Sequence, residues 1–176
     1  MYQRILVPVD GSPTSDLGLA EAIKLAKLTG GRLRLVHVID ELSLVRSTSA
    51  YGGYSNDWLA TMRAAGAKVL KDAHATAAAS DVQAEECLSD NFQGAVHEMV
   101  CADAKSWPAD LIVIGTHGRR GVSRMVMGSS AEHIARLSPV PVLLVHDVAA
   151  QAHRAKALHE LESLDMRVPA GVLALE

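Results

Sequence analysis

The chain has 176 residues, of which 49% are hydrophobic, 21% charged and 3% aromatic, and its formal net charge is −3. The apolar fraction excludes a disordered chain, and the small net charge excludes a strongly basic nucleic-acid-binding protein. Two cysteines, Cys87 and Cys101, are too few for a disulfide scaffold and lack metal-ligand spacing. Apolar runs such as Leu111–Ile114 are far shorter than the roughly 20 residues of a membrane-spanning helix, and no signal peptide is recognisable. We therefore expect a cytoplasmic protein that binds neither nucleic acid nor membrane.

Strand-like and helix-like segments alternate from the start of the chain. The run Ile5–Val9 is short and mostly β-branched, which predicts a strand that stops at the turn residues of Asp10–Pro13. Apolar residues at helical spacing then predict a helix up to Lys27, and Thr29–Gly31 is typical of a glycine C-cap. The segment Leu33–Ile39 alternates at first with Arg32 and Arg34 and is then nearly all apolar, which predicts the second strand.

A long segment rich in Ser, Gly and Tyr, Asp40–Asn56, predicts a loop that either closes over a ligand or has no role of its own. The elements predicted after it are a helix at Trp58–Ala79, a strand at Val82–Leu88, a helix at Gln93–Ser106, a strand at Leu111–Ile114, a helix at Ser129–Leu137 and a strand at Val142–His146. This order with apolar strands predicts an α/β fold, a doubly wound three-layer sandwich with a five-stranded, mostly parallel sheet.

A group of glycines follows the most apolar of these strands. Gly115, Gly118 and Gly128-Ser129 form the spacing G-x2-G-x9-G-S, and Gly128-Ser129 opens the next predicted helix. In a doubly wound sheet, ligands bind beyond the carboxyl ends of the strands, where the strand order reverses. There Gly115 would turn sharply off the strand, Gly118 would let main-chain amides approach an anion, and Gly128-Ser129 would offer a helix N-terminus. The pattern predicts a phosphate site that is neither a P-loop nor a G-x-G-x-x-G dinucleotide fingerprint.

Ionisable side chains lie inside the same motif. Arg119, Arg120 and Arg124 would neutralise phosphate charge. His117 either touches phosphate or is a solvent-exposed loop residue. The eight histidines show no H-x3-H spacing and no accompanying Cys-x2-Cys, which speaks against a zinc site.

The glycine motif resembles the signature of the ATP-binding branch of the universal stress protein family, G-x2-G-x9-G-[ST]. Three further segments resemble the family's first, second and last strands: Arg4–Ser12, Leu35–Ile39 and Ser138–Val145. The resemblance implies a nucleotide-binding domain over residues 1–147, with a Rossmann-like fold similar to that of the adenine nucleotide alpha hydrolases. Residues 148–176 are then a C-terminal extension, partly helical or flexible, that either packs on a partner subunit, binds another protein or is frayed.

The resemblance also implies a ligand and the residues that bind it. Family members with this signature bind ATP, so the implied ligand is ATP, with or without Mg²⁺. The phosphate-binding positions that match are Gly115, Gly118, Gly128, Ser129 and Ser130, with His117 and Arg119 inside the loop. The adenosine end is assigned to Pro8, Val9, Asp10 and Val38.

Two of these assignments leave alternatives open. Asp10 either receives polar groups of the nucleoside, helps to hold Mg²⁺, or is a turn or helix N-cap residue, a task that Ser12 can share. Because the chain has one Phe and two Trp, we expect the base to rest on aliphatic side chains such as Val9 and Val38, unless Tyr51 or Tyr54 reaches in.

The resemblance further implies a homodimer that forms through the last strand, Val140–His146. An apolar edge strand without a partner invites aggregation, which favours a partner independently. Our leading hypothesis is a homodimeric regulatory or stress-response protein that binds ATP and has further, unknown protein partners. No catalytic base is apparent, so we expect no dedicated ATPase. The alternatives are a nucleotide-independent interaction module of the same fold and a slow nucleotide hydrolase.

Overall fold

A computed structural model describes residues 1–39, 56–90, 94–116 and 128–146 of the chain. Met1–His146 form one compact unit, which contains all the described residues. None of the helices in this described part is long and apolar enough to cross a membrane.

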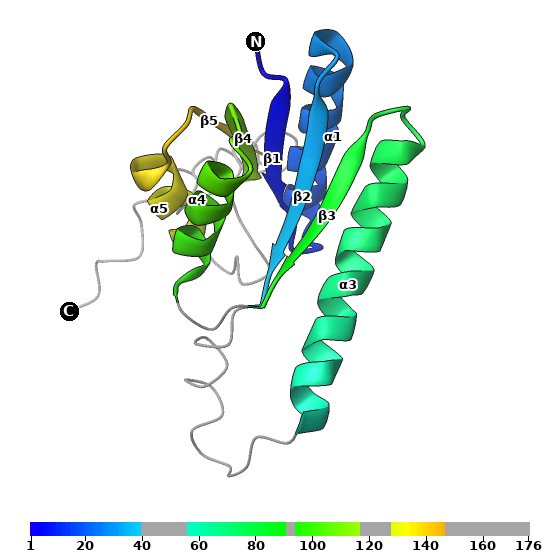
Figure 1. The fold of residues 1–176 in the computed structure, drawn as a ribbon, viewed down its shortest axis with the longest axis vertical. Coiled ribbons are helices and arrows are strands. Elements are labelled where there is room, and N and C mark those ends of the chain that lie inside the picture. Colours follow the sequence, from blue (N-terminus) through cyan, green and yellow to red (C-terminus); the bar gives the residue numbers. More distant parts are fainter. Residues whose placement is uncertain (40–55, 91–93, 117–127, 147–176) are drawn as a thin grey trace, which may run out of the picture. The chain divides into compact units, whose positions relative to one another are not determined.

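The strands form one five-stranded sheet with the order β3-β2-β1-β4-β5 (Figure 1). Their bounds are Arg4–Pro8 for β1, Arg32–Val38 for β2, Ala84–Ser89 for β3, Leu111–Gly115 for β4 and Val142–Val145 for β5. All four strand pairings are parallel. The predicted doubly wound α/β fold is therefore confirmed, and the sheet is parallel throughout its described strands.

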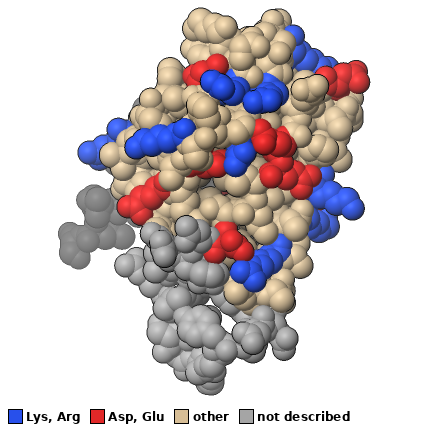
Figure 2. All heavy atoms as spheres, viewed as in Figure 1, with Lys and Arg blue, Asp and Glu red and all other residues tan. Residues whose placement is uncertain are grey.

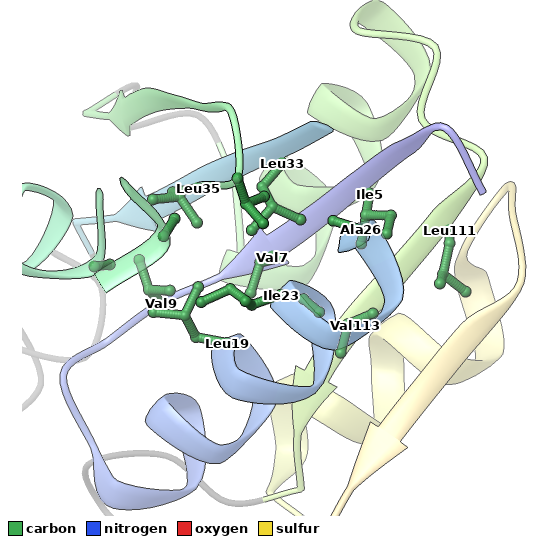
Figure 3. Close-up of a cluster of buried hydrophobic side chains, with 14 of the residues drawn as sticks. Ile5, Val7, Val9, Leu19, Ile23, Ala26, Leu33, Leu35, Leu111 and Val113 are labelled. Carbon is green, nitrogen blue, oxygen red and sulfur yellow. The ribbon is translucent and has the colours of Figure 1, made fainter. Parts of the chain in front are cut away.

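Four helices in the described ranges cover the two faces of the sheet. They are α1 (Pro13–Thr29), α3 (Asn56–Ala78), α4 (Val96–Ser106) and α5 (Ser129–Leu137). Side chains of α1 and α3 pack with one face of the strands in a cluster that includes Val7, Leu35 and Val113 (Figure 3). Side chains of α4 and α5 pack with the other face, around Leu6 and Ile112. Because neighbouring strand residues point to opposite faces, each apolar strand feeds both clusters.

The ends of α1 follow from the turn residues of the sequence. Ser12 is the N-cap, and its Oγ accepts a hydrogen bond from the Ser15 amide at 3.2 Å. Pro13 occupies the first helical position, where a missing N–H costs nothing. At the other end Gly30 adopts a φ of +67°, and its amide donates to the Ala26 carbonyl, so the predicted glycine C-cap is confirmed.

The surface carries a mixture of positive and negative side chains, as the near-neutral composition predicts. On the face of the molecule that Figure 2 shows, Lys and Arg are interspersed with Asp and Glu, and no field of one sign extends across it. The position of a binding site therefore has to come from local geometry.

Candidate functional site

The strand order reverses between two neighbouring strands in the middle of the sheet, β1 and β4 (Figure 1). The connection after β1 leads to α1 on one face, whereas the next helix after β4, α5, lies on the other face. Connections that leave in opposite directions open a crevice at the carboxyl ends of such strands, which is where doubly wound proteins bind ligands. We call this edge of the sheet, formed by the residues that end β1, β2 and β4 and by the N-terminus of α5, the carboxyl edge.

Both ends of the glycine motif meet at the carboxyl edge. The Thr116 amide donates to the Val145 carbonyl at 3.0 Å and so continues the β4–β5 ladder by one residue. The Thr116 carbonyl accepts from the Gly128 amide at 2.8 Å. This second bond brings the N-terminus of α5 to the end of β4, although eleven residues separate Thr116 from Gly128 in the sequence.

Gly115 has a different structural role from the one that the sequence suggested. It is the last residue of β4, it is buried, and its φ lies outside the left-handed region, so the expected sharp turn at Gly115 is wrong. The glycine is needed because α1 lies so close: an added Cβ would run into the carbonyl of Thr14 and lie 3.1 Å from the Ser15 nitrogen. Gly18 makes the same approach from the helix side, since its Cβ would lie 3.1 Å from the Gly115 nitrogen.

The N-terminus of α5 presents main-chain amides at this edge. Gly128 is the N-cap and has no side chain that could bond these amides, so within the described residues the first turn is left open to a ligand. Ser129 is exposed and Ser130 is half-buried, so both hydroxyls are near the open end of the helix. Glu132 also lies in the first turn, where it would repel an anion, but its carboxylate pairs with Arg136 at 3.8 Å.

Two histidines pack beside this helix end. His133 Nδ1 lies 2.6 Å from the Ser129 carbonyl oxygen, which can only accept, so the ring donates this hydrogen bond. The ring of His133 stacks on the ring of His97 from α4, with 4.6 Å between the centroids. The first turn of α5 is thereby held against α4.

Asp10 organises the turn that follows β1. Its Oδ1 accepts a hydrogen bond from the Ser12 amide at 2.9 Å, and its own amide donates to Ser15 Oγ at 3.2 Å. Asp10 is thus a turn residue while Ser12 is the helix cap, which is the structural alternative that the sequence left open. The half-buried carboxylate nevertheless lies at the carboxyl edge, where a ribose hydroxyl or a cation would also meet it. In the described parts of the chain, no group of three or more His, Cys, Asp or Glu is arranged to hold a metal ion.

The ladder between β1 and β2 ends in an unusual way. The Val9 amide donates to the Val36 carbonyl at 2.8 Å, and the regular register stops at the pair Pro8–Val36. The Val9 carbonyl does not bond the Val38 amide, the next step of a parallel ladder; it accepts instead from His37 Nδ1 at 2.7 Å.

The main chain of Val38 is left open as a result. The next amide, that of Ile39, donates to Ser89 of β3 at 2.9 Å, so by alternation the Val38 N–H and C=O point to the β1 side, beyond the end of β1. Within the described residues, the Val38 amide has no hydrogen-bond acceptor. A donor and an acceptor on one residue therefore face the carboxyl edge.

The side chains of Val9 and Val38 do not form a common apolar surface. Val9 is 5% exposed and belongs to the core under α1 and α3. Val38 is half-buried and packs with the cluster under α4 and α5, on the opposite face of the sheet. Val9 therefore contributes main-chain atoms to the carboxyl edge rather than a surface for a base, and Pro8, the last residue of β1, precedes it.

Several predicted site residues lie outside the described part of the chain. They are His117, Gly118 and Arg119, together with Arg120 and Arg124. The segment Asp40–Asn56, except for Asn56 in α3, and the extension 148–176 lie outside it as well. The described residues that the carboxyl edge brings together are Pro8, Val9, Asp10, Val38, Gly115, Gly128, Ser129 and Ser130. Sequence reasoning missed His37, whose only signal was an imidazole between the apolar residues Val36 and Val38.

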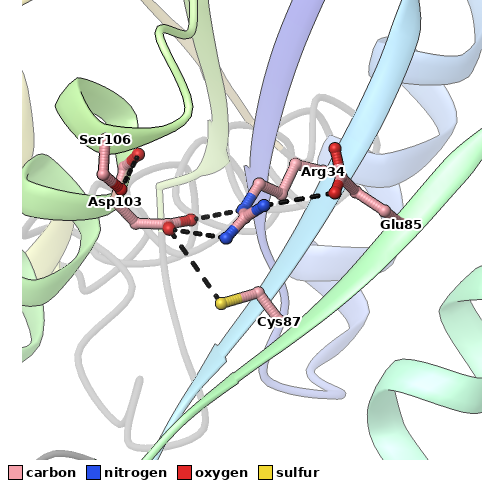
Figure 4. Close-up of polar contacts among 5 residues, drawn as sticks. All are labelled: Arg34, Glu85, Cys87, Asp103 and Ser106. Atoms are coloured by element: carbon pink, nitrogen blue, oxygen red, sulfur yellow. Dashed lines mark hydrogen bonds and ion pairs between the residues drawn. The ribbon is translucent and has the colours of Figure 1, made fainter.

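A second polar cluster lies away from this edge and is closed on itself (Figure 4). Arg34 of β2 donates to both carboxylate oxygens of Asp103 in α4, at 2.9 and 3.0 Å, and to Glu85 of β3 at 3.2 Å. Its guanidinium also lies 5.8 Å from the ring centroid of Trp107. Burial, and then the negative charge of Asp103, raise the pKa of the neighbouring Cys87 thiol. These residues bond one another, and the cluster links β2, β3 and α4.

Comparison with known proteins decides the family. The model of the universal stress protein family matches residues 1–146. The chain belongs to the universal stress protein family. The universal stress protein YxiE of Bacillus subtilis is 32% identical over 152 residues, covering 82% of this chain and 99% of that relative.

Solved structures agree with the fold described above. A universal stress protein from Burkholderia pseudomallei is similar with a TM-score of 0.64 and 31% identity, covering 82% of this chain and 96% of its own. A universal stress protein from Archaeoglobus fulgidus, solved in complex with dAMP, has a TM-score of 0.61 at 23% identity and covers 82% of this chain and 98% of its own. At that identity the second likeness shows the fold alone.

Proposed function

We propose that this universal stress protein binds ATP at the carboxyl edge and acts as a nucleotide-regulated homodimer. The observation that carries the proposal is the hydrogen bond from the Gly128 amide to the Thr116 carbonyl, which sets the open N-terminus of α5 at the point where the strand order reverses. The dAMP bound by the Archaeoglobus fulgidus relative supports an adenine nucleotide as the ligand class.

The described residues fit the phosphate end of such a ligand. The first-turn amides of α5 and its partial positive charge favour an anion, and the hydroxyls of Ser129 and Ser130 add donors beside them. Gly118, His117 and Arg119, which the sequence places between β4 and α5, would add further amides and positive charge.

The adenosine end fits the main chain at the ends of β1 and β2. The open Val38 N–H and C=O would pair with the acceptor and donor on the edge of adenine. The Asp10 carboxylate would accept from the ribose hydroxyls or help to hold Mg²⁺. These groups would bind and orient the nucleotide. Two expectations remain predictions: that the chain is no dedicated ATPase, and that it is cytoplasmic.

Isothermal titration calorimetry of the full chain with ATP tests this function. We expect saturable binding by the parent chain and no detectable binding by Gly118→Val, whose side chain would fill the phosphate nest. Gly30→Asn is the matched control: Gly30 lies at the opposite end of α1, a Cβ there meets no atom within 4 Å, and Asn tolerates its φ of +67°. Equal affinity of Gly118→Val and the parent would refute the phosphate site. A parent chain that binds no nucleotide, and releases none on acid extraction, would favour the nucleotide-independent module.

The dimer is proposed through β5, which forms one edge of the described sheet. Thr116 and Ile112 donate to the carbonyls of Val145 and Pro141, so by alternation the amides of Val142 and Leu144 point to the open side. Leu143 is 36% exposed at the centre of this strand. ATP that binds one dimeric state better than another would shift the balance between them.

Light scattering coupled to size exclusion measures the dimer directly. We expect a dimer for the parent and a monomer for Leu143→Arg, because the substitution adds a positive charge at the centre of β5 in each copy, and the two charges would repel each other when the strands pair. A parent chain that remains monomeric at high concentration would refute dimerisation.

A further inference from the structure

Four polar residues are buried in the described part of the molecule, and all four lie at the carboxyl edge: Ser12, Ser15, His37 and Thr116. Three of them carry hydroxyl groups and are explained by the turn after β1 and the ladder after β4. His37 is the ionisable one, is 6% exposed, and lies on a strand whose neighbours are apolar. Burial of an imidazole costs free energy unless its polar atoms form hydrogen bonds.

The position of the His37 ring is fixed from both sides. On one side Nδ1 lies 2.7 Å from the Val9 carbonyl oxygen, which can only accept, so Nδ1 carries a proton and donates it to this bond. On the other side the ring lies against α3 at Gly66, where an added Cβ would be 2.7 Å from His37 Cδ2 and 2.8 Å from Leu88 Cδ1. Any larger residue at Gly66 would therefore clash with the ring and with Leu88.

The hydrogen bond changes what the main chain offers. In a regular parallel ladder the Val9 carbonyl would accept from the Val38 amide. Because the His37 ring donates to this carbonyl in its place, the Val38 amide keeps no acceptor among the described residues and faces the carboxyl edge. The same bond holds the Val9 carbonyl in place directly before Asp10.

We infer that His37 is a positioning residue for base recognition: its side chain ends the β1–β2 ladder one step early and so reserves the Val38 main chain for the edge of an adenine ring. The inference rests on the proposed nucleotide function and deepens it, since it assigns the base preference to a residue that does not itself touch the ligand. Adenine and guanine present opposite donors and acceptors on this edge, so a fixed N–H and C=O pair discriminates between them.

The experiment compares ATP and GTP binding to the full chain by calorimetry, with three variants. His37→Leu removes the donor but keeps an apolar side chain, whereas His37→Asn keeps an N–H near the position of Nδ1. His74→Leu is the control, because His74 is a half-exposed histidine on α3 whose Nδ1 lies 3.7 Å from a carboxylate oxygen of Glu86. We expect the parent to prefer ATP about tenfold or more, as one matched pair of hydrogen bonds provides. His37→Leu should lose about tenfold in ATP affinity with GTP affinity unchanged, and His37→Asn and His74→Leu should retain the preference.

The outcomes separate the two proposals. A parent chain that binds neither nucleotide refutes the proposed function. A parent that binds ATP and GTP equally, a His37→Leu variant that keeps the ATP preference, or one that loses both nucleotides equally would each overturn the role of His37 alone. If His37→Leu does not fold, the ring nitrogens of the parent, labelled with ¹⁵N, decide: the His37 Nδ1 resonance should shift more with ATP than with GTP, and equal shifts would overturn the inference.

Discussion

The two ends of the sheet differ in what becomes of their main-chain hydrogen-bonding groups. At the amino end, side chains close them: the Asp110 carboxylate accepts from the amides of Gln3 and Arg4 at 2.8 and 3.2 Å. Thr29 Oγ1 donates to the Tyr2 carbonyl at 2.9 Å. At the carboxyl edge the Val38 amide and the first turn of α5 are left open within the described residues. A main-chain donor without an acceptor in the protein can bond a ligand, whereas one that is already bonded stabilises the fold.

This contrast shows why a hollow alone does not locate a site. The amino end carries an open groove, with charged residues that include Arg4, Lys27, Arg32, Asp81 and Asp110. The C-terminus of α1 ends there, and its partial negative charge is complemented by Lys27 in its last turn. With its charges of both signs and its main-chain amides already bonded to Asp110, the groove has less to offer an anion than the carboxyl edge.

The largest expected effect comes from a larger side chain in place of Gly115 at the carboxyl edge. In Gly115→Val the side chain meets the main chain of Thr14 and Ser15, which cannot move aside as a flexible side chain would. We expect a loss of about 3 kcal/mol in the free energy of unfolding, measured by urea denaturation, together with loss of ATP binding. Gly30→Asn at the amino end should cost less than about 1 kcal/mol. Equal losses at the two glycines would show that close approach of α1 is not what requires Gly115.

The sequence predicted the architecture well because strands such as β4 are short apolar runs bounded by turn residues, and such runs depend on local composition. The glycine spacing predicted that Gly115 belongs to the site. It could not predict why a glycine is required there, because the close contact is with a helix about 100 residues earlier in the chain. The sequence could not reveal the open Val38 amide either, because that depends on where the β1–β2 register ends. His37 shows the same limit: its bond to Val9 links residues 28 apart in sequence.

A smaller effect separates stability from binding at the amino end. In Asp110→Ala the amides of Gln3 and Arg4 lose their acceptor, and we expect a loss of about 1–2 kcal/mol in the free energy of unfolding. ATP affinity, measured by calorimetry at a temperature where the variant is folded, should be unchanged. A change in affinity of more than about threefold would contradict the division of roles between the two ends.

The matching change at the carboxyl edge should act on both quantities. Asp10→Ala removes the acceptor of the Ser12 amide and should cost about 1 kcal/mol of stability. It should also lower ATP affinity by about tenfold, because the carboxylate no longer meets the nucleoside or its cation. Ser12→Ala provides the comparison: loss of the N-cap costs about 1 kcal/mol as well, with a smaller change in affinity. If the two variants lose ATP affinity equally, Asp10 serves only the turn.

The smallest effect extends the comparison to the Arg34 cluster, which is closed in the same way as the amino end. Burial and the charge of Asp103 raise the pKa of Cys87, so its thiolate is scarce near neutral pH and alkylation by iodoacetamide should be slow. Asp103→Asn removes the negative charge, which lowers this pKa and moves the pH profile of the alkylation rate to lower pH. In a Cys101→Ser background, which leaves one thiol, we expect the rate at pH 8 to rise about threefold. ATP affinity should stay constant, because the cluster lies away from the carboxyl edge. A profile that moves to higher pH would mean that the substitution acts mainly through Arg34, which would move away from the thiol and no longer lower its pKa. Charge pairing would then contribute less to the cluster than its geometry indicates.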